Sequence, residues 1–360
     1  MSCNYLEDLG AVLMTTTEKN EPYGLLRAGF PFLKTIGMRR ITNYPYDVAI
    51  DSDERIYVLL RGLNQAVIRV WFFKDAERLP DTFEDIGSYG EGEGQFIWPV
   101  SVILDDDKNI IVSDEALDRI TVFSRSGDFI KSWGESGSKP GQLSGPSGLS
   151  LTPDGNLLIA DTKNHRIQEF TLDGEYLNSW GTQGSDNGQL TMPWGIATDN
   201  YGNVFVSDWG NHRVCKFTPD GKFVSSFGKQ GNGKGELSGP SGIAVDKYGD
   251  IFVTDTDNNR IVLFNKEGNY VQEFIGDATL AKCARDYMLT NAGSNRLRDM
   301  ADLEIQKRFR DPRSVRVDDK GRMYVPDYRS FRIQIYQNEV IPLDETQYAP
   351  PRTSRSLLQE

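Results

Sequence analysis

The chain has 360 residues and a formal net charge of −12 at pH 7. Nucleic acids and anionic membranes are bound through clustered positive charge, so this balance argues against both as general partners. The two histidines and the three cysteines without paired spacing exclude a three-histidine zinc site, and we expect neither a metal nor another cofactor. The same cysteine usage fits a reducing compartment. No secretion signal opens the sequence and no apolar run is long enough to cross a bilayer, so we expect a cytoplasmic protein without membrane contact.

The first part of the chain holds an extension, one isolated strand and a weak repeat. Residues 1–29 form an amino-terminal extension without a repeat pattern. The run at 32–37 resembles the fourth strand of a later copy, at 129–134. The weak copy opens at Pro45 with an alternating apolar run and continues in a β-branched run at 55–59.

Between residues 99 and 276 the sequence repeats with a period of 47 residues. Each copy opens at a proline and reads as four short strands separated by turns. Four strands in roughly 40–50 residues are typical of a propeller blade, which buries its faces against its neighbours. The columns that keep the interval are Pro99, Pro146, Pro193 and Pro240; Asp114, Asp161, Asp208 and Asp255; Arg119, Arg166, Arg213 and Arg260; Phe123, Phe170, Phe217 and Phe264.

The last part of the chain breaks this period. Residues 277–311 are rich in helix formers with apolar residues at three-to-four spacing, which predicts two short helices split near 291–294. A sixth copy opens at Pro312 and stops after its third strand, so we expect residues 30–38 to supply its fourth strand and to remove the exposed edges. The prediction is an all-β, six-bladed propeller of four-stranded antiparallel blades over residues 30–340, with a helical insertion between the fifth and sixth blades and a tail at 341–360.

Asn-His-Arg runs at 164–166 and 211–213 follow the aspartates of the repeat, Asp161 and Asp208. With these runs, residues 45–336 resemble the NHL repeat. NHL propellers serve as enzymes, RNA-binding modules or interaction platforms, so this resemblance fixes the fold more than the function. The layout is also similar to the propellers of peptidyl-hydroxyglycine amidating lyases, whose zinc-binding histidines directly follow the blade-opening prolines. Here those positions carry Val100, Trp194 and Arg313, so the resemblance implies no zinc. Arg61-Gly62 resembles the Arg-Gly with which those lyases hold a substrate oxygen anion.

Departures from the repeat gather on one face, because the loops that enter the blades and the loops between second and third strands reach the same end of a propeller. Arginines there suit carboxylate or phosphate recognition, aromatic rings suit a flat ligand, and a buried carboxylate could transfer protons. We therefore predict catalytic roles for Arg61, Asp47, Glu115 and Tyr328, and binding of a small molecule by Tyr46, Trp98, Trp194, Trp209 and Arg313. The alternative is structural: the tryptophans fill the channel or the gaps between blades, and the arginines pair with the aspartate column.

Three functions remain open from the sequence. The first is a metal-independent lyase or hydrolase that acts on a small carboxylated or phosphorylated molecule at the mouth of the central channel. The second is a non-catalytic platform that binds a protein partner, or a second copy of the chain, through residues 278–308. The third is an RNA-binding propeller, which requires a continuous basic patch. The insertion at 277–311 is either a lid over the first site or the contact surface of the second.

Overall fold

The computed structural model describes residues 24–74, 84–291, 293, 296 and 302–343. The chain divides into two units, Pro31–Gln337 and the joined ends Met1–Phe30 with Asn338–Glu360. The described part of the second unit is an antiparallel ribbon in which β1 (Gly24–Gly29) pairs with β28 (Glu339–Leu343).

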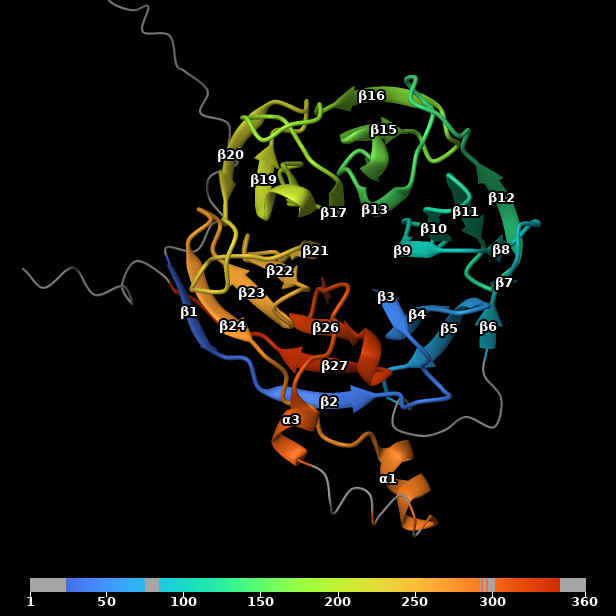
Figure 1. Cartoon of the computed structure of the whole chain (residues 1–360), viewed down its shortest axis with the longest axis vertical. Coiled ribbons are helices and arrows are strands. Elements are labelled where there is room, and N and C mark those ends of the chain that lie inside the picture. Colours follow the sequence, from blue (N-terminus) through green and yellow to red (C-terminus); the bar gives the residue numbers. More distant parts are fainter. Residues whose placement is uncertain (1–23, 75–83, 292, 294–295, 297–301, 344–360) are drawn as a thin grey trace, which may run out of the picture. The chain divides into compact units, whose positions relative to one another are not determined.

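The unit Pro31–Gln337 is a ring of six four-stranded antiparallel sheets, which confirms the predicted fold (Figure 1). In chain order the blades are β3 (Pro45–Ile50), β4 (Arg55–Gly62), β5 (Gln65–Phe72) and β6 (Glu84–Ile86); β9 (Pro99–Leu104), β10 (Ile110–Asp114), β11 (Arg119–Phe123) and β12 (Phe129–Trp133); β13 (Pro146–Leu151), β14 (Leu157–Asp161), β15 (Arg166–Phe170) and β16 (Tyr176–Trp180); β17 (Pro193–Thr198), β18 (Val204–Asp208), β19 (Arg213–Phe217) and β20 (Phe223–Phe227); β21 (Pro240–Val245), β22 (Ile251–Asp255), β23 (Arg260–Phe264) and β24 (Tyr270–Phe274); and β25 (Arg316–Val317), β26 (Arg322–Asp327), β27 (Arg332–Gln337) and β2 (Phe32–Ile36).

The sixth blade is completed by the strand from the other end of the unit. β2 pairs antiparallel with β27, with Phe32 opposite Tyr336 and Ile36 opposite Ile333. Strands far apart in the sequence therefore share one sheet, and the ring has no open edge between its first and last blades. A small parallel pair, β7 (Ser88–Tyr89) with β8 (Gln95–Phe96), lies in the connection between the first two blades.

Adjacent blades bury their apolar faces against each other. One core cluster joins Leu158 and Ile167 of the third blade to Val206 and Phe217 of the fourth. Cys215 lies in this cluster and is fully buried. Successive side chains of a strand point to opposite faces of its sheet, and each face packs in a cluster of this kind. This explains why the second and third strands are nearly continuous apolar runs in the sequence.

In the second to fifth blades, the glycine in the turn between the third and fourth strands allows a close contact with the preceding blade. Gly221 has φ +79°, and a Cβ added there would lie 2.6 Å from the ring of Trp180 in the preceding blade. Gly155 has nearly the same φ, +82°, but nothing lies within 4 Å of its added Cβ. Both positions need the left-handed backbone that glycine adopts without strain. At Gly221 the ring of Trp180 also leaves no room for a Cβ atom.

We expect Gly221→Ala to lower the free energy of unfolding by about 1–3 kcal/mol more than Gly155→Ala, because overpacking adds to the shared backbone strain. Urea unfolding of the two variants and the parent measures the difference. Equal losses in the two variants would contradict the role given to the Trp180 contact.

The aspartate column is structural. Asp161 accepts a hydrogen bond from Arg166 Nε at 2.8 Å and from the backbone N–H of Ser144 at 2.7 Å. The other nitrogens of Arg166 donate to carbonyl oxygens of residues 138, 139 and 142. The pair thus ties the end of the second strand to the loop that enters the blade, and it holds the backbone of one face of the ring in place.

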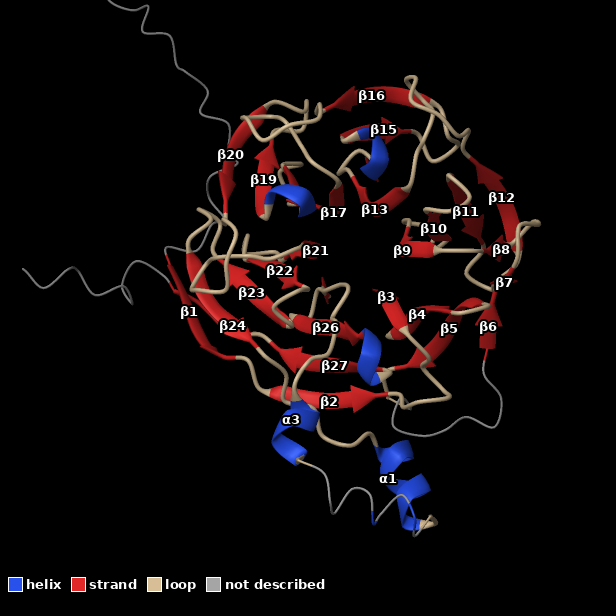
Figure 2. Ribbon diagram, viewed as in Figure 1, coloured by secondary structure: helices blue, strands red, loops and turns tan. Residues whose placement is uncertain are grey.

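The insertion contains α1 (Lys282–Leu289) and α3 (Leu303–Lys307) among its described residues. In Figures 1 and 2 both helices lie beyond the outer strand β2, and neither crosses the centre of the ring. The described helices therefore do not form the lid that was one expectation for 277–311. The segment that follows α3 is anchored by Phe309, which is buried and lies near the ring of Tyr336. Within the described residues no helix combines the length and the apolar character that crossing a membrane requires.

Candidate functional site

Two positions in each blade line the mouth, the end of the central channel at which the loops between second and third strands lie. One position follows the blade-opening proline, and the other follows the residue of the second strand that pairs with this proline. In the third blade these are Ser147 and Thr162, whose hydroxyls are 2.6 Å apart and donate to carbonyl oxygens of Trp194 and Pro193 in the next blade. Ser241 and Thr256 repeat this arrangement in the fifth blade. The Ser–Thr pair is thus a link between blades.

The other four blades replace this link with larger or charged side chains. Arg61 occupies the second position of the first blade, because Leu60 pairs with Pro45 as Asp208 pairs with Pro193 in the fourth blade. The four replacement pairs are Tyr46 with Arg61, Val100 with Glu115, Trp194 with Trp209, and Arg313 with Tyr328. Seven of the nine side chains predicted from the sequence belong to these pairs, and only Asp47 and Trp98 do not.

Two arginines lie beside the buried ring of Tyr46. The Cζ atom of Arg61 lies 4.7 Å from the ring centre and that of Arg313 lies 6.0 Å from it. Arg313 also lies 5.4 Å from the ring of Tyr328, whose ring is 5.9 Å from that of Tyr46. Glu115 accepts a hydrogen bond from Arg61 Nη2 at 2.8 Å and forms an ion pair with it. The structure thus brings together five of the predicted residues, which we call the mouth cluster: Tyr46, Arg61, Glu115, Arg313 and Tyr328.

Both arginines of the mouth cluster keep donor capacity. Nη1 of Arg61 and Nε of Arg313 are buried and have no hydrogen-bond partner within the described part of the chain. Buried donors without partners are unfavourable and rare in folded proteins. An anion placed at the mouth could accept from these groups, and arginine favours carboxylate and phosphate oxygens for this purpose.

The two tyrosines are proton donors rather than acceptors at neutral pH. Burial raises the pKa of Tyr46 to about 12, although the neighbouring Arg61 and Arg313 act in the opposite direction. Burial likewise raises the pKa of Tyr328, against the effect of the same two arginines. Both side chains therefore remain phenols under ordinary conditions, and each can donate a hydrogen bond or a proton to developing negative charge.

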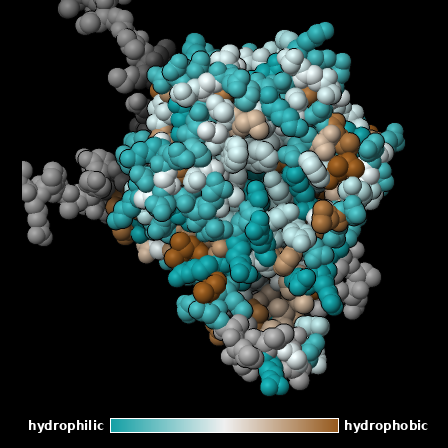
Figure 3. Space-filling model, viewed as in Figure 1, coloured by the Kyte–Doolittle hydropathy of each residue, from teal (hydrophilic) through white to brown (hydrophobic). Residues whose placement is uncertain are grey.

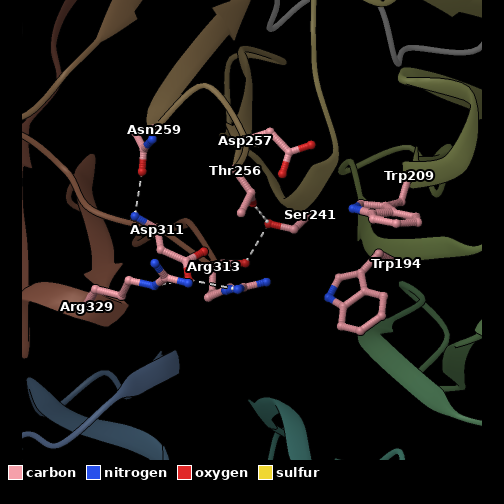
Figure 4. Close-up of a pocket in the computed structure, with 9 residues that line it drawn as sticks. All are labelled: Trp194, Trp209, Ser241, Thr256, Asp257, Asn259, Asp311, Arg313 and Arg329. Carbon is pink, nitrogen blue, oxygen red and sulfur yellow. Dashed lines mark hydrogen bonds and ion pairs between the residues drawn. The ribbon is translucent and has the colours of Figure 1, made fainter.

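A cavity of about 340 Å³ adjoins the mouth cluster between the fourth, fifth and sixth blades. Figure 4 shows Trp194 and Trp209 on one side, and Arg313 and Arg329 with Asp311 on the other. Asp311 accepts a hydrogen bond from Arg313 Nη2 at 2.8 Å and forms an ion pair with Arg329, whose Nε lies 3.1 Å away. Trp194 and Arg313 also line the narrow channel beside Tyr46. The cavity thus offers two indole rings opposite two guanidinium groups, and it meets the mouth cluster at Arg313.

Asp47 lies deeper than the sequence suggested. Its carboxylate is buried and accepts from Arg316 Nε at 3.1 Å and Nη2 at 2.6 Å. Four further donors occupy it: the backbone N–H of Val48 and Val102 and the hydroxyls of Ser101 and Ser314. These groups belong to the first, second and sixth blades. With six hydrogen bonds already made, Asp47 serves the closure of the ring, and we withdraw it as a candidate for proton transfer.

Trp98 is the remaining predicted residue, and it lies at the outer margin of the mouth cluster. Its side chain is 53% exposed, and Arg61 Cζ lies 5.4 Å from its ring. It does not line the 340 Å³ cavity. On the face drawn in Figure 3, hydrophilic side chains surround the centre of the ring and apolar ones form separate patches. Trp98 therefore packs against the arginine of the mouth cluster and leaves most of its own surface to solvent.

Several cavity residues were not predicted from the sequence, chiefly Asp311 and Arg329. Asp311 precedes a blade-opening proline, where the other copies have Tyr44, Trp98, Gly145, Met192 and Gly239. Its charge departs from the repeat, so this residue could have been identified from the sequence. Arg329 stands one position beyond Tyr328, where the repeat varies in every copy, so the sequence held no comparable signal. Among the described residues no cluster of three or more His, Cys, Asp or Glu side chains is arranged to hold a metal ion.

Comparisons with known proteins agree with the observed ring. A family model described as a 6-bladed beta-propeller matches residues 195–333, and one described as an NHL repeat matches residues 143–170. The six observed blades agree with the first match: the chain is a six-bladed β-propeller, and its segment 143–170 matches an NHL repeat. None of the curated proteins matches the sequence.

Solved structures with the same fold include lyases. A catalytically inactive virginiamycin B lyase from Staphylococcus aureus with quinupristin has a TM-score of 0.54 and 13% identity, over 88% of this chain and 89% of that chain. A streptogramin B lyase has a TM-score of 0.55 and 13% identity, over 86% and 98%. A protein of unknown function from Bacteroides thetaiotaomicron has a TM-score of 0.56 and 16% identity, over 87% and 72%. At these identities the likeness shows the fold alone.

Proposed function

We propose that the protein is a metal-independent lyase or hydrolase that acts on a small carboxylated or phosphorylated molecule bound at the mouth. The observation that carries this proposal is the pair Arg61 and Arg313 beside the ring of Tyr46, each with a donor nitrogen that no described residue uses. Donors held in place before the reaction stabilise charge that develops in a transition state.

The mouth cluster supplies the parts that such a reaction needs. Arg313 binds the anionic group of the substrate, and the indole rings of Trp194 and Trp209 contact a flat or apolar part in the adjoining cavity. Arg61 stabilises the oxygen on which charge develops, and Tyr46 or Tyr328 donates the proton. Glu115, which pairs with Arg61 at 2.8 Å, is the base. The likeness to virginiamycin B lyase and streptogramin B lyase supports the fold's suitability for lyase chemistry.

Incubation with a panel of ring-bearing carboxylate and phosphate esters and lactones tests this proposal. We expect mass spectrometry to detect product from at least one anionic member, and none from the corresponding neutral amides and alcohols. A hydrolase adds one water to the sum of the products, whereas a lyase does not. Dialysis against EDTA should leave the rate unchanged, because no step uses a metal. A panel without any product, or a rate that EDTA abolishes, would contradict the proposal.

A second candidate function is self-association through the insertion. Leu289 and Tyr287 of α1 are 72% and 43% exposed, and Leu303 of α3 is 43% exposed. Large apolar side chains in solvent mark contact surfaces when they lie together. Light scattering after size exclusion distinguishes the two states: a dimer that Leu289→Glu converts to a monomer supports this function, and a monomeric parent excludes it.

A further inference from the structure

A second hollow adjoins the tryptophan cavity. It has a volume of about 560 Å³ and is lined by Ile305 of α3, the segment 308–311, and Asn259 and Arg329. The two hollows share Asn259, Asp311 and Arg329. Because they share these walls, the two hollows lie side by side, and we call the second one the outer hollow.

Positive charge is concentrated in the outer hollow. Its lining includes the guanidinium groups of Arg308, Arg310 and Arg329, against the single carboxylate of Asp311. That carboxylate is already bound by Arg313 and Arg329. Arg308 and Arg310 are exposed, and no described residue pairs with their side chains. In a chain with a net charge of −12, this local excess attracts an anionic group.

These arginines differ from the arginines of the repeat. Arg166, Arg213 and Arg260 each donate hydrogen bonds to carbonyl oxygens of the loop that enters their blade. Their guanidinium groups are therefore already occupied within the fold. Arg308 and Arg310 lie between α3 and Pro312, at positions where the other copies of the repeat have no arginine. Their side chains therefore have no part in the blade-to-blade network.

The backbone that carries them is nevertheless fixed. Phe309 is buried between them, and its N–H donates to the carbonyl of Ile275 at 3.0 Å. The N–H of Arg310 donates to Asp327 at 2.7 Å, and its carbonyl accepts from the N–H of Arg329 at 3.1 Å. Free side chains on a fixed backbone lose less entropy when they bind a ligand than a mobile loop does.

We infer that the molecule bound at this face is an elongated dianion with a flat ring. Its ring lies in the tryptophan cavity, one anionic group binds Arg313, and a second carboxylate or phosphate binds Arg308, Arg310 and Arg329 in the outer hollow. This inference rests on the function proposed above, because the first anion and the ring occupy the site described there. It adds a second anion subsite and excludes monoanions as the preferred substrates.

Two nearly isosteric probes test the second subsite. Indole-3-acetyl-glutamate carries two carboxylates, and indole-3-acetyl-glutamine has an amide in place of the second. Calorimetric titration of the full chain should give about tenfold tighter binding of the glutamate probe, since one charge-assisted pair contributes on the order of 1.4 kcal/mol. In Arg308→Gln/Arg310→Gln the ratio should fall to about one. Lys282→Gln/Arg285→Gln on α1 removes the same charge elsewhere and should keep the preference.

The outcomes separate this inference from the proposal on which it rests. Binding of the glutamine probe that Arg313→Gln weakens, together with no preference for glutamate, would overturn the second subsite and leave the first intact. Failure of both probes to bind would overturn both. A preference that disappears equally in the α1 variant would also overturn the subsite, because long-range charge would then explain it.

Discussion

Replacing Asp47 with alanine is expected to lower the free energy of unfolding by about 3–5 kcal/mol, the usual loss when one partner of a buried ion pair is removed. Asp47 is buried beside the channel, and its removal leaves Arg316 without its carboxylate. It also leaves the hydroxyl of Ser314 and the N–H of Val102 without their acceptor. These donors come from the sixth and second blades, so the variant weakens the junction at which the ring closes. Urea unfolding followed by tryptophan fluorescence measures the change.

An exposed ion pair provides the control. Asp173 pairs with Lys131 on the surface, and Asp173→Asn should leave the unfolding midpoint unchanged, since exposed pairs contribute little. The milder Asp47→Asn keeps the shape and separates the two roles considered for this residue. Loss of turnover with an unchanged midpoint would restore Asp47 as a group that transfers protons, and it would refute the assignment to ring closure.

The fold could be predicted because the repeat records it in every copy. The proline, aspartate and arginine columns each mark a position that the structure uses in the same way, such as the bond from Arg166 to Asp161. The role of Asp47 could not be predicted, because its partner Arg316 lies 269 positions away in the chain. No local pattern reveals that the two ends of the ring bring these residues together.

The candidate site was predictable where it departs from a symmetric pattern. Trp194, Trp209 and Arg313 replace the small residues that link other blades, and they surround one cavity. The course of the insertion was not predictable, because amphipathic spacing at 282–289 predicts a helix but not the direction in which the connection leaves the sheet. For the same reason the arginines after α3 were not recognised as a possible anion site from the sequence.

Replacing Arg61 with alanine is expected to lower turnover on the best substrate of the ester and lactone panel by roughly 100- to 1,000-fold, the usual effect of removing one donor to a developing oxyanion. Arg61 lies at the end of β4, beside Tyr46 and bound to Glu115. The substitution removes the donor and also frees the carboxylate that it holds. Steady-state kinetics should show the loss mainly in kcat, because Arg313 remains to bind the anionic group.

Arg55 is a matched control in the same strand. It begins β4 at the opposite face of the ring, and it pairs with Glu84 at 2.9 Å. Arg55→Ala therefore removes an ion-paired arginine from the same blade without touching the mouth, and it should keep full turnover. Both variants should lower the melting temperature to a similar extent, because the two arginine side chains are similarly buried, at 16% and 14% exposed. Full turnover in Arg61→Ala would remove this arginine from the reaction, whereas equal losses in both variants would assign the effect to the stability of the first blade.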